Sequence, residues 1–110
     1  MKLEEMIPVE NDLINMSLAD LADKVLVCLS AFSKNGTQIR RRGLAGRLLM
    51  GYPSEFERQS RLAIEEALML LENQMLIGVD PDEQEFVFIT RLGKSHLGEI
   101  EQAPVLARNR

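Results

Sequence analysis

Basic side chains are concentrated in one part of this sequence. Residues 24 to 54 contain six basic residues and no acidic residue, although the whole chain has a net charge of -4. Arginine presents N–H donors in a planar fork that matches the oxygens of a phosphate group. Because the local field governs binding more than the mean charge, we expect five side chains of this block to contact nucleic-acid phosphates: Lys34, Arg40, Arg41, Arg42 and Arg47. The alternative is a solvated surface that balances the acidic stretches of the same chain.

A second group of polar side chains lies near the start of the longest expected helix. Arg58 and Arg61 are of the type that binds guanine edges, and Gln59 is of the type that binds adenine edges. Glu55 and Glu57 lie in the same segment and would repel phosphates. The alternative is therefore an exposed first helical turn, whose acids interact with the helix dipole.

Residues for catalysis or metal binding do not occur in a useful combination. His96 is the single histidine, without a second histidine, cysteine or acid at metal-ligand spacing. Cys28 lies among apolar residues at helical spacing and is expected to be a small core residue. Ser17, Ser54 and Thr90 are explained as helix caps, and none has a base at suitable spacing. We expect no enzyme, no metal and no cofactor.

Composition indicates a single intracellular domain. A chain of 110 residues, 45% hydrophobic and 27% charged, is long enough to bury a core. One cysteine excludes an internal disulfide and suits a reducing compartment, so we expect the protein in the cytoplasm. The first residues, MKLEEMIPVENDL, contain acids where a signal sequence needs an apolar core. No apolar run approaches the ~18 residues of a membrane span, so we expect no membrane partner, and no small-molecule ligand is indicated.

Hydrophobic spacing predicts three helices, at residues 17–34, 42–50 and 54–73. In the first, apolar residues recur every three or four positions, with Ser17 as the N-cap and Asn35-Gly36 as the end. Gly51 ends the second helix. The third begins with the pattern of a capping box, Ser54 and Glu57.

The pattern changes to short β-type runs after the third helix. Residues 76–79 and 86–89 flank the turn sequence DPDEQE and predict a hairpin. Thr37 to Ile39 could form one more extended stretch. Thr90 is placed to cap a last helical turn through Leu97. The predicted fold class is therefore mainly α with a small β-hairpin (α+β), organised as an N-terminal arm with a short turn (1–16), a domain (17–97) and a flexible C-terminal tail (98–110).

Three helices followed by a hairpin resemble the winged helix-turn-helix superfamily. The segment EEALMLLENQMLIGVDPDEQEFVFITRLGKSHL carries the resemblance: a leucine pair ends the third helix, and an aromatic strand ends in a Thr-x-x-Gly turn. The sequence also resembles the amino-terminal segment of an uncharacterised family of bacterial defence-associated proteins, through Tyr52-Pro53, Ala67 to Leu71 and Phe88 to Gly93. The usual glycine before the first wing strand is Met75 here, and these 110 residues do not include the second domain that the resemblance to those larger proteins leads us to expect.

The resemblance implies binding to double-stranded DNA, as in a transcriptional regulator. The second helix would lie beside the phosphate backbone, and the third helix would be the recognition helix. The acidic loop from Asp80 to Glu85 departs from this pattern, because a wing beside phosphates normally carries basic residues. The alternative function is a protein-interaction or dimerisation winged helix that binds no nucleic acid.

Surplus apolar residues on the third helix indicate self-association. Leu62 and Met69 lie outside the stripe that would fill the core. They would contact either the N-terminal arm or a second copy of the protein across a two-fold axis. We expect a homodimer in which these two residues contribute to the interface.

Overall fold

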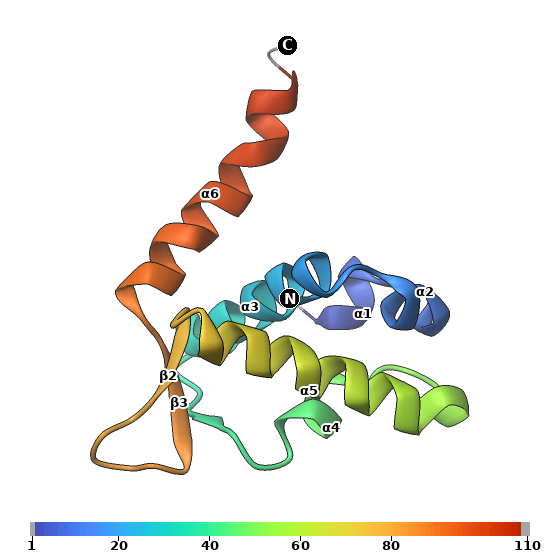
Figure 1. Cartoon of the computed structure of the whole chain (residues 1–110), viewed down its shortest axis with the longest axis horizontal. Helices are drawn as coiled ribbons and strands as arrows, with labels where there is room; N and C mark the ends of the chain where they lie inside the picture. The colour runs from blue at the N-terminus through green and yellow to red at the C-terminus, as the bar shows by residue number, and fades with distance from the viewer. Residues whose placement is uncertain (1, 109–110) are drawn as a thin grey trace.

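A computed structural model of the chain describes residues 2–108, with side chains described for 2–53 and 55–101. Within this part, six helices accompany a three-stranded antiparallel sheet (Figure 1), so the predicted α+β class is confirmed. In chain order the elements are α1 (Leu3–Met6), α2 (Glu10–Asn15), α3 (Leu18–Lys34), β1 (Ile39–Arg40), α4 (Leu44–Leu48), a 3-10 turn (Ser54–Phe56), α5 (Glu57–Asn73), β2 (Ile77–Val79), β3 (Phe86–Ile89) and α6 (Arg91–Arg108).

Helices α3 and α5 form the centre of the core and pack against each other (Figure 1). Each has a buried stripe with spacings of three and four residues: Leu21, Ala22, Val25, Leu26, Cys28 and Leu29 on α3, and Ile64, Ala67, Leu68 and Leu71 on α5. Burial of one such leucine or isoleucine contributes roughly 1.5–3 kcal/mol. The predicted limits of α3 are confirmed, because the Ser17 hydroxyl accepts from the Asp20 N–H at 3.2 Å and Gly36 has a φ of 75°.

The sheet has the strand order β1-β3-β2. The predicted hairpin is confirmed, with Ile77 opposite Ile89 and Val79 opposite Val87. Only Ile39 of the extended stretch expected at Thr37 to Ile39 lies in a strand, because β1 comprises Ile39 and Arg40; this strand pairs with the other side of β3. The hairpin turn is stabilised by Asp80, whose carboxylate accepts hydrogen bonds from two backbone N–H groups of the turn.

The first sixteen residues form more structure than the single turn that we expected. Two short helices, α1 and α2, place Leu3, Ile7 and Leu13 in the core, each at most 2% exposed. The Tyr52 hydroxyl donates to the Ile7 carbonyl, and the Ser60 hydroxyl donates to the buried Glu10 carboxylate at 2.7 Å. The segment is therefore part of the domain core. Neither helix is long enough to display an apolar period in the sequence.

The start of α5 and the extent of α4 differ from the predictions. α4 spans Leu44–Leu48 instead of 42–50, with Gly43 as its N-cap in the left-handed conformation. Three glycines in and around so short a segment disfavour a longer helix. α5 begins at Glu57 after the 3-10 turn, so the predicted start at Ser54 was wrong. Phe56 is the N-cap residue, and the side chain of Ser54 lies outside the described residues.

The chain turns from α5 into β2 through Met75, which has a φ of 60°. The left-handed conformation is rare for a residue with a side chain and is easily adopted by glycine. Met75, which replaces the usual glycine of the winged-helix pattern, therefore adopts the backbone geometry that glycine would provide. Met75 remains 69% exposed.

Helix α6 extends well beyond the predicted end at Leu97. It runs from Arg91 to Arg108, and Figure 1 shows it projecting away from the other helices. The cap prediction is confirmed, because the Gly93 N–H donates to the Thr90 hydroxyl at 2.9 Å. The prediction that the helix ends at Leu97 was wrong, and residues 109–110 of the expected tail lie outside the described residues.

Among residues 2–108, no helix combines the length and the apolar character that a membrane crossing requires.

Candidate nucleic-acid interface

The short strand β1 and the turn after it determine where the arginines of the basic block lie. Ile39 is 3% exposed and faces the core, so the alternation of a strand directs Arg40 outward. The Arg41 N–H donates to the Glu85 carbonyl at 2.9 Å, which ties the end of β1 to the hairpin. Gly43 then reverses the chain with a φ of 76°, and Arg47 follows on α4.

This path brings Arg40, Arg42 and Arg47 together around one surface pocket of about 430 Å³. We call it the arginine pocket; its remaining lining residues are Gln38, Gly43, Leu44 and Phe86. All three arginines are exposed. Three arginines that line one depression create a positive potential that suits phosphate oxygens.

Two of the pocket arginines are positioned by aromatic rings. The Arg47 guanidinium carbon lies 4.4 Å from the centroid of the Phe32 ring, which belongs to α3. The Arg40 guanidinium carbon lies 5.7 Å from the centroid of Phe86. Stacking on an aromatic face holds a guanidinium in place while its N–H donors stay free to bind a ligand. The Glu85 carboxylate lies 3.9 Å from Arg40, so three positive charges and one negative charge surround the pocket.

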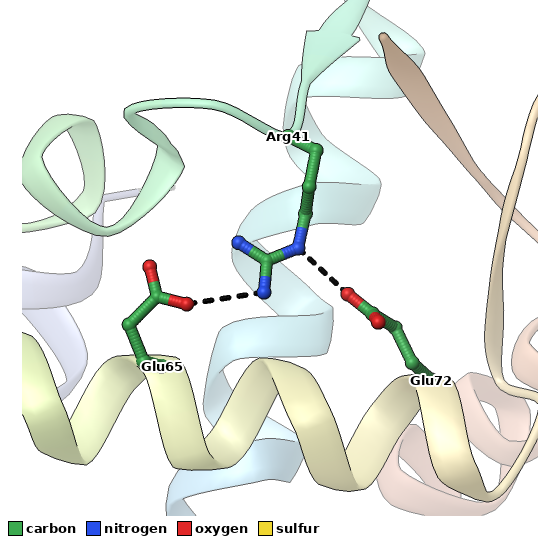
Figure 2. A network of polar contacts seen from close by, with 3 residues as sticks. All are labelled: Arg41, Glu65 and Glu72. Atoms are coloured by element: carbon green, nitrogen blue, oxygen red, sulfur yellow. Dashed lines mark hydrogen bonds and ion pairs between the residues drawn. The ribbon is translucent and has the colours of Figure 1, made fainter. Parts of the chain in front are cut away.

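Arg41 lies apart from this pocket, although it is the central residue of the arginine run. Figure 2 shows its guanidinium between Glu65 and Glu72 of α5, at distances of 3.0 Å and 2.6 Å. Partial burial acts to lower the pKa of Arg41, but hydrogen bonds and charges of the two glutamates outweigh it and raise that pKa above its ordinary value. Both of its charge contacts are made inside the protein, so this arginine links the basic segment to α5.

The other predicted nucleic-acid contacts lie outside the arginine pocket. Lys34 lines a different depression together with Lys94 of α6. Arg58 and Gln59 are exposed in the first turn of α5. Arg61 is also exposed, but it forms an ion pair with Glu57 one turn earlier. The predicted residues therefore include one group of arginines at the pocket, of the type that binds phosphates, and a separate group of polar residues on α5.

The apolar residues predicted for the dimer interface are exposed. Leu62 is 51% exposed and Met69 is 61% exposed, so the N-terminal segment does not cover either side chain. Met69 lines a groove of about 620 Å³ between α5 and the start of α3, together with Leu18, Leu70, Glu66, Glu72 and Asn73. Apolar and acidic side chains thus lie next to one another along this groove.

Cys28 and His96, whose side chains are of reactive types, are each held by contacts within the fold. Burial raises the pKa of the Cys28 thiol to about 11, which keeps it protonated and disfavours nucleophilic chemistry. His96 has partners that the sequence did not reveal: Nε2 lies 2.7 Å from Asp23 on α3, and Nδ1 lies 3.4 Å from Glu99. Within the described residues, no three or more His, Cys, Asp or Glu side chains are grouped to hold a metal ion.

The aromatic partners of the arginines were missed in the sequence analysis. The run Phe86–Ile89 alternates between the two sheet faces, which could have placed Phe86 and Phe88 on the same face. The contact of Phe32 with Arg47 had no local signal, because it joins two helices. Comparisons with protein-family models, with curated proteins and with solved structures found no match for this chain.

Proposed function

We propose that this chain is a winged-helix module that binds double-stranded DNA. The observation that carries the proposal is the convergence of Arg40, Arg42 and Arg47 on the arginine pocket. Phosphate contacts supply most of the sequence-independent affinity of DNA-binding proteins, and arginine is well suited to make them. The net charge of -4 does not oppose this function, because the acids are concentrated in other segments.

The winged-helix part of the proposal is supported by the order of the elements. Helix α3, strand β1, helices α4 and α5 and the hairpin β2-β3 follow one another, and β1 pairs with β3. In a winged helix, α4 would lie beside the DNA backbone and α5 would be the recognition helix. Arg58 and Gln59 would then contact base edges, whereas Arg61 would first have to leave Glu57. Fold alone is an analogy, so the binding itself must be measured.

The test is a titration of labelled random duplex DNA with the full chain at low and moderate salt. If the pocket arginines contact phosphates, affinity falls steeply as salt increases, and the double variant Arg42→Ala/Arg47→Ala flattens that salt slope by roughly two. The matched control, Arg91→Ala/Lys94→Ala, removes the same charge from α6, at residues that do not line the arginine pocket. Failure of the folded wild-type protein to bind any duplex at low salt would reject the proposal.

A second candidate function, protein interaction through α5, is favoured by the groove beside Met69. We infer that Leu62 and Met69 bury their exposed surface against a second copy, because exposed large apolar side chains favour association and Met69 also lines a groove. Met69→Glu would place a carboxylate against apolar surface and weaken association. Sedimentation of the wild-type and Met69→Glu proteins tests this, and a monomeric wild-type mass at high micromolar concentration would contradict it.

A further inference from the structure

The outer face of the sheet carries aromatic side chains. Ile39, Ile77 and Val87 are buried on the inner face, each at most 6% exposed. Side chains alternate along a strand, so Phe86 and Phe88 project together on the opposite face. On that face, the strand register places Arg40 opposite Phe86 and Gly78 opposite Phe88.

Phe88 occupies the space that a side chain at position 78 would fill. A Cβ atom added to Gly78 would lie 3.1 Å from Cε1 and Cζ of the Phe88 ring, so the ring reaches across to the neighbouring strand. Packing over a glycine is a known way to stabilise a sheet, and it accounts for the covered side of this ring. Phe88 nevertheless remains 44% exposed, which leaves aromatic surface accessible to a ligand.

The two phenylalanines are continuous with the arginine pocket. Phe86 is a lining residue of that pocket, and Arg40 lies over its ring at 5.7 Å. Phe88 follows two residues later on the same strand face, about 6.8 Å further along. The surface thus passes from the exposed ring of Phe88 to the half-buried ring of Phe86, and from there to the three arginines of the pocket. Aromatic rings beside a positively charged groove are the combination by which proteins bind single-stranded nucleic acid.

We propose that Phe86 and Phe88 form a platform on which unpaired bases stack, while the arginine pocket holds the phosphates of the same strand. Bases inside a duplex are covered by their neighbours, so the platform serves a single-stranded segment, such as an extension at a duplex end. This inference rests on the proposed function of the arginine pocket. None of the four acids of the hairpin turn lines the arginine pocket, whose lining includes three arginines. Glu85 of the turn lies 3.9 Å from one of them, Arg40.

The experiment compares three labelled probes with the full chain: a blunt duplex, the same duplex with a single-stranded oligothymidine extension, and the single strand alone. We expect tighter binding of the duplex with the extension than of the blunt duplex. Phe88→Ala should weaken binding of the extended probe by roughly 5- to 150-fold, the range that loss of one base–aromatic stack produces. Affinity for the blunt duplex should stay unchanged.

Three further variants separate stacking from folding. Phe88→Leu keeps an apolar side chain but lacks an aromatic face, so it should lose as much affinity as Phe88→Ala. Phe88→Tyr should retain it. Val79→Ala, a change at an exposed apolar residue of the same hairpin, should leave affinity unchanged. Thermal unfolding of each variant establishes that it is folded.

The outcomes distinguish this inference from the proposed function. Equal binding of the blunt and extended duplexes, or full affinity in folded Phe88→Leu, would overturn the stacking platform and leave duplex binding intact. Binding of the single strand and the extended duplex, but not of the blunt duplex, would support the platform and reject the duplex proposal. If none of the three probes binds at low salt, both proposals fall.

Discussion

The Nε atom of Arg41 donates a hydrogen bond of 2.6 Å to the Glu72 carboxylate, a residue 31 positions further along the chain. With the second contact to Glu65, it fastens the segment between β1 and α4 to the middle and end of α5 (Figure 2). The Arg41 side chain is 27% exposed, so water screens these contacts only in part. Arg41 thus fixes the position of two segments relative to each other: the segment from β1 to α4, which carries the pocket arginines, and α5, which carries the second polar group.

Arg41→Ala is predicted to destabilise the fold by about 1–2 kcal/mol, since it leaves two partly buried carboxylates without their partner. Arg41→Lys should recover only part of the loss, because an ammonium cannot reproduce the forked geometry. Urea denaturation measures both. The neighbouring control Arg40→Ala, whose ion pair is 3.9 Å long and 61% exposed, should cost less than about 0.5 kcal/mol. Equal costs at positions 40 and 41 would contradict this prediction.

Met75→Gly is predicted to stabilise the protein by about 1 kcal/mol. The left-handed conformation costs a residue with a Cβ roughly 1–2 kcal/mol, and glycine removes that cost at the expense of some chain entropy. Little packing is lost, because Met75 is 69% exposed. The comparison is Met69→Gly, at a methionine inside α5 that is 61% exposed, which should destabilise by about 1 kcal/mol. Thermal unfolding that gave both variants the same sign would refute the argument.

Two glycines of α6 should respond to alanine in opposite directions. A Cβ at Gly93 would lie 2.1 Å from the Leu76 carbonyl oxygen, so Gly93→Ala must displace backbone and is predicted to cost more than about 2 kcal/mol. Apart from its chain neighbours and the backbone of its own helix, no atom of the described residues lies within 4 Å of a Cβ at Gly98, so Gly98→Ala should stabilise the helix by about 0.5–1 kcal/mol. Denaturation midpoints of the two variants test this prediction. A Gly93→Ala protein as stable as the wild type would be inconsistent with the close approach of Gly93 to the Leu76 carbonyl.

The stability contributed by His96 should depend on pH. The hydrogen bond to Asp23 raises the pKa of His96 in the folded state above its ordinary value of about 6.5. A raised pKa means that the folded state binds the proton more tightly than the unfolded state, so the stabilisation is complete below about pH 6.5 and is lost as pH rises through the folded-state pKa. The Tm difference between wild type and His96→Gln should therefore shrink with increasing pH.

The single histidine makes this prediction direct to check, because its ring proton signals in an NMR titration need no assignment. Asp23→Asn should bring the His96 pKa back toward its ordinary value, since it removes the acceptor's charge. A titration midpoint in the wild type at or below that of Asp23→Asn would show that the helix α3 carboxylate does not act on His96.

The elements that the sequence predicts well are those with a long local pattern. The apolar period of α3 repeats over 17 residues, and the hairpin is bounded by an Asp-Pro turn, so both could be located without tertiary information. Helices α1 and α2 have four and six residues, too few to show a period, and their burial depends on α3 and α5. α6 was predicted too short, because its later residues lack a clear period yet still form helix.

The candidate site was predictable in residue type and not in arrangement. The arginine run identified a basic segment, but adjacent arginines of that run make different contacts. Arg41 pairs with α5, whereas Arg40 and Arg42 line the pocket. Arg41 is the arginine that forms ion pairs within the protein because it contacts Glu65 and Glu72, which lie 24 and 31 positions further along the chain. Likewise, Asp23 is 73 positions from His96. Contacts at such separations leave no trace in local spacing.

The strand order also limits how molecules of this protein can aggregate. The sheet ends on one side at β1, with two residues, and on the other at β2, with three. Growth of a cross-β fibril needs an edge of about six residues with free backbone N–H and C=O groups. The longest strand, β3, is paired on both sides and offers no such edge. Short outer strands therefore protect an aromatic, β-forming hairpin from seeding fibrils at high concentration.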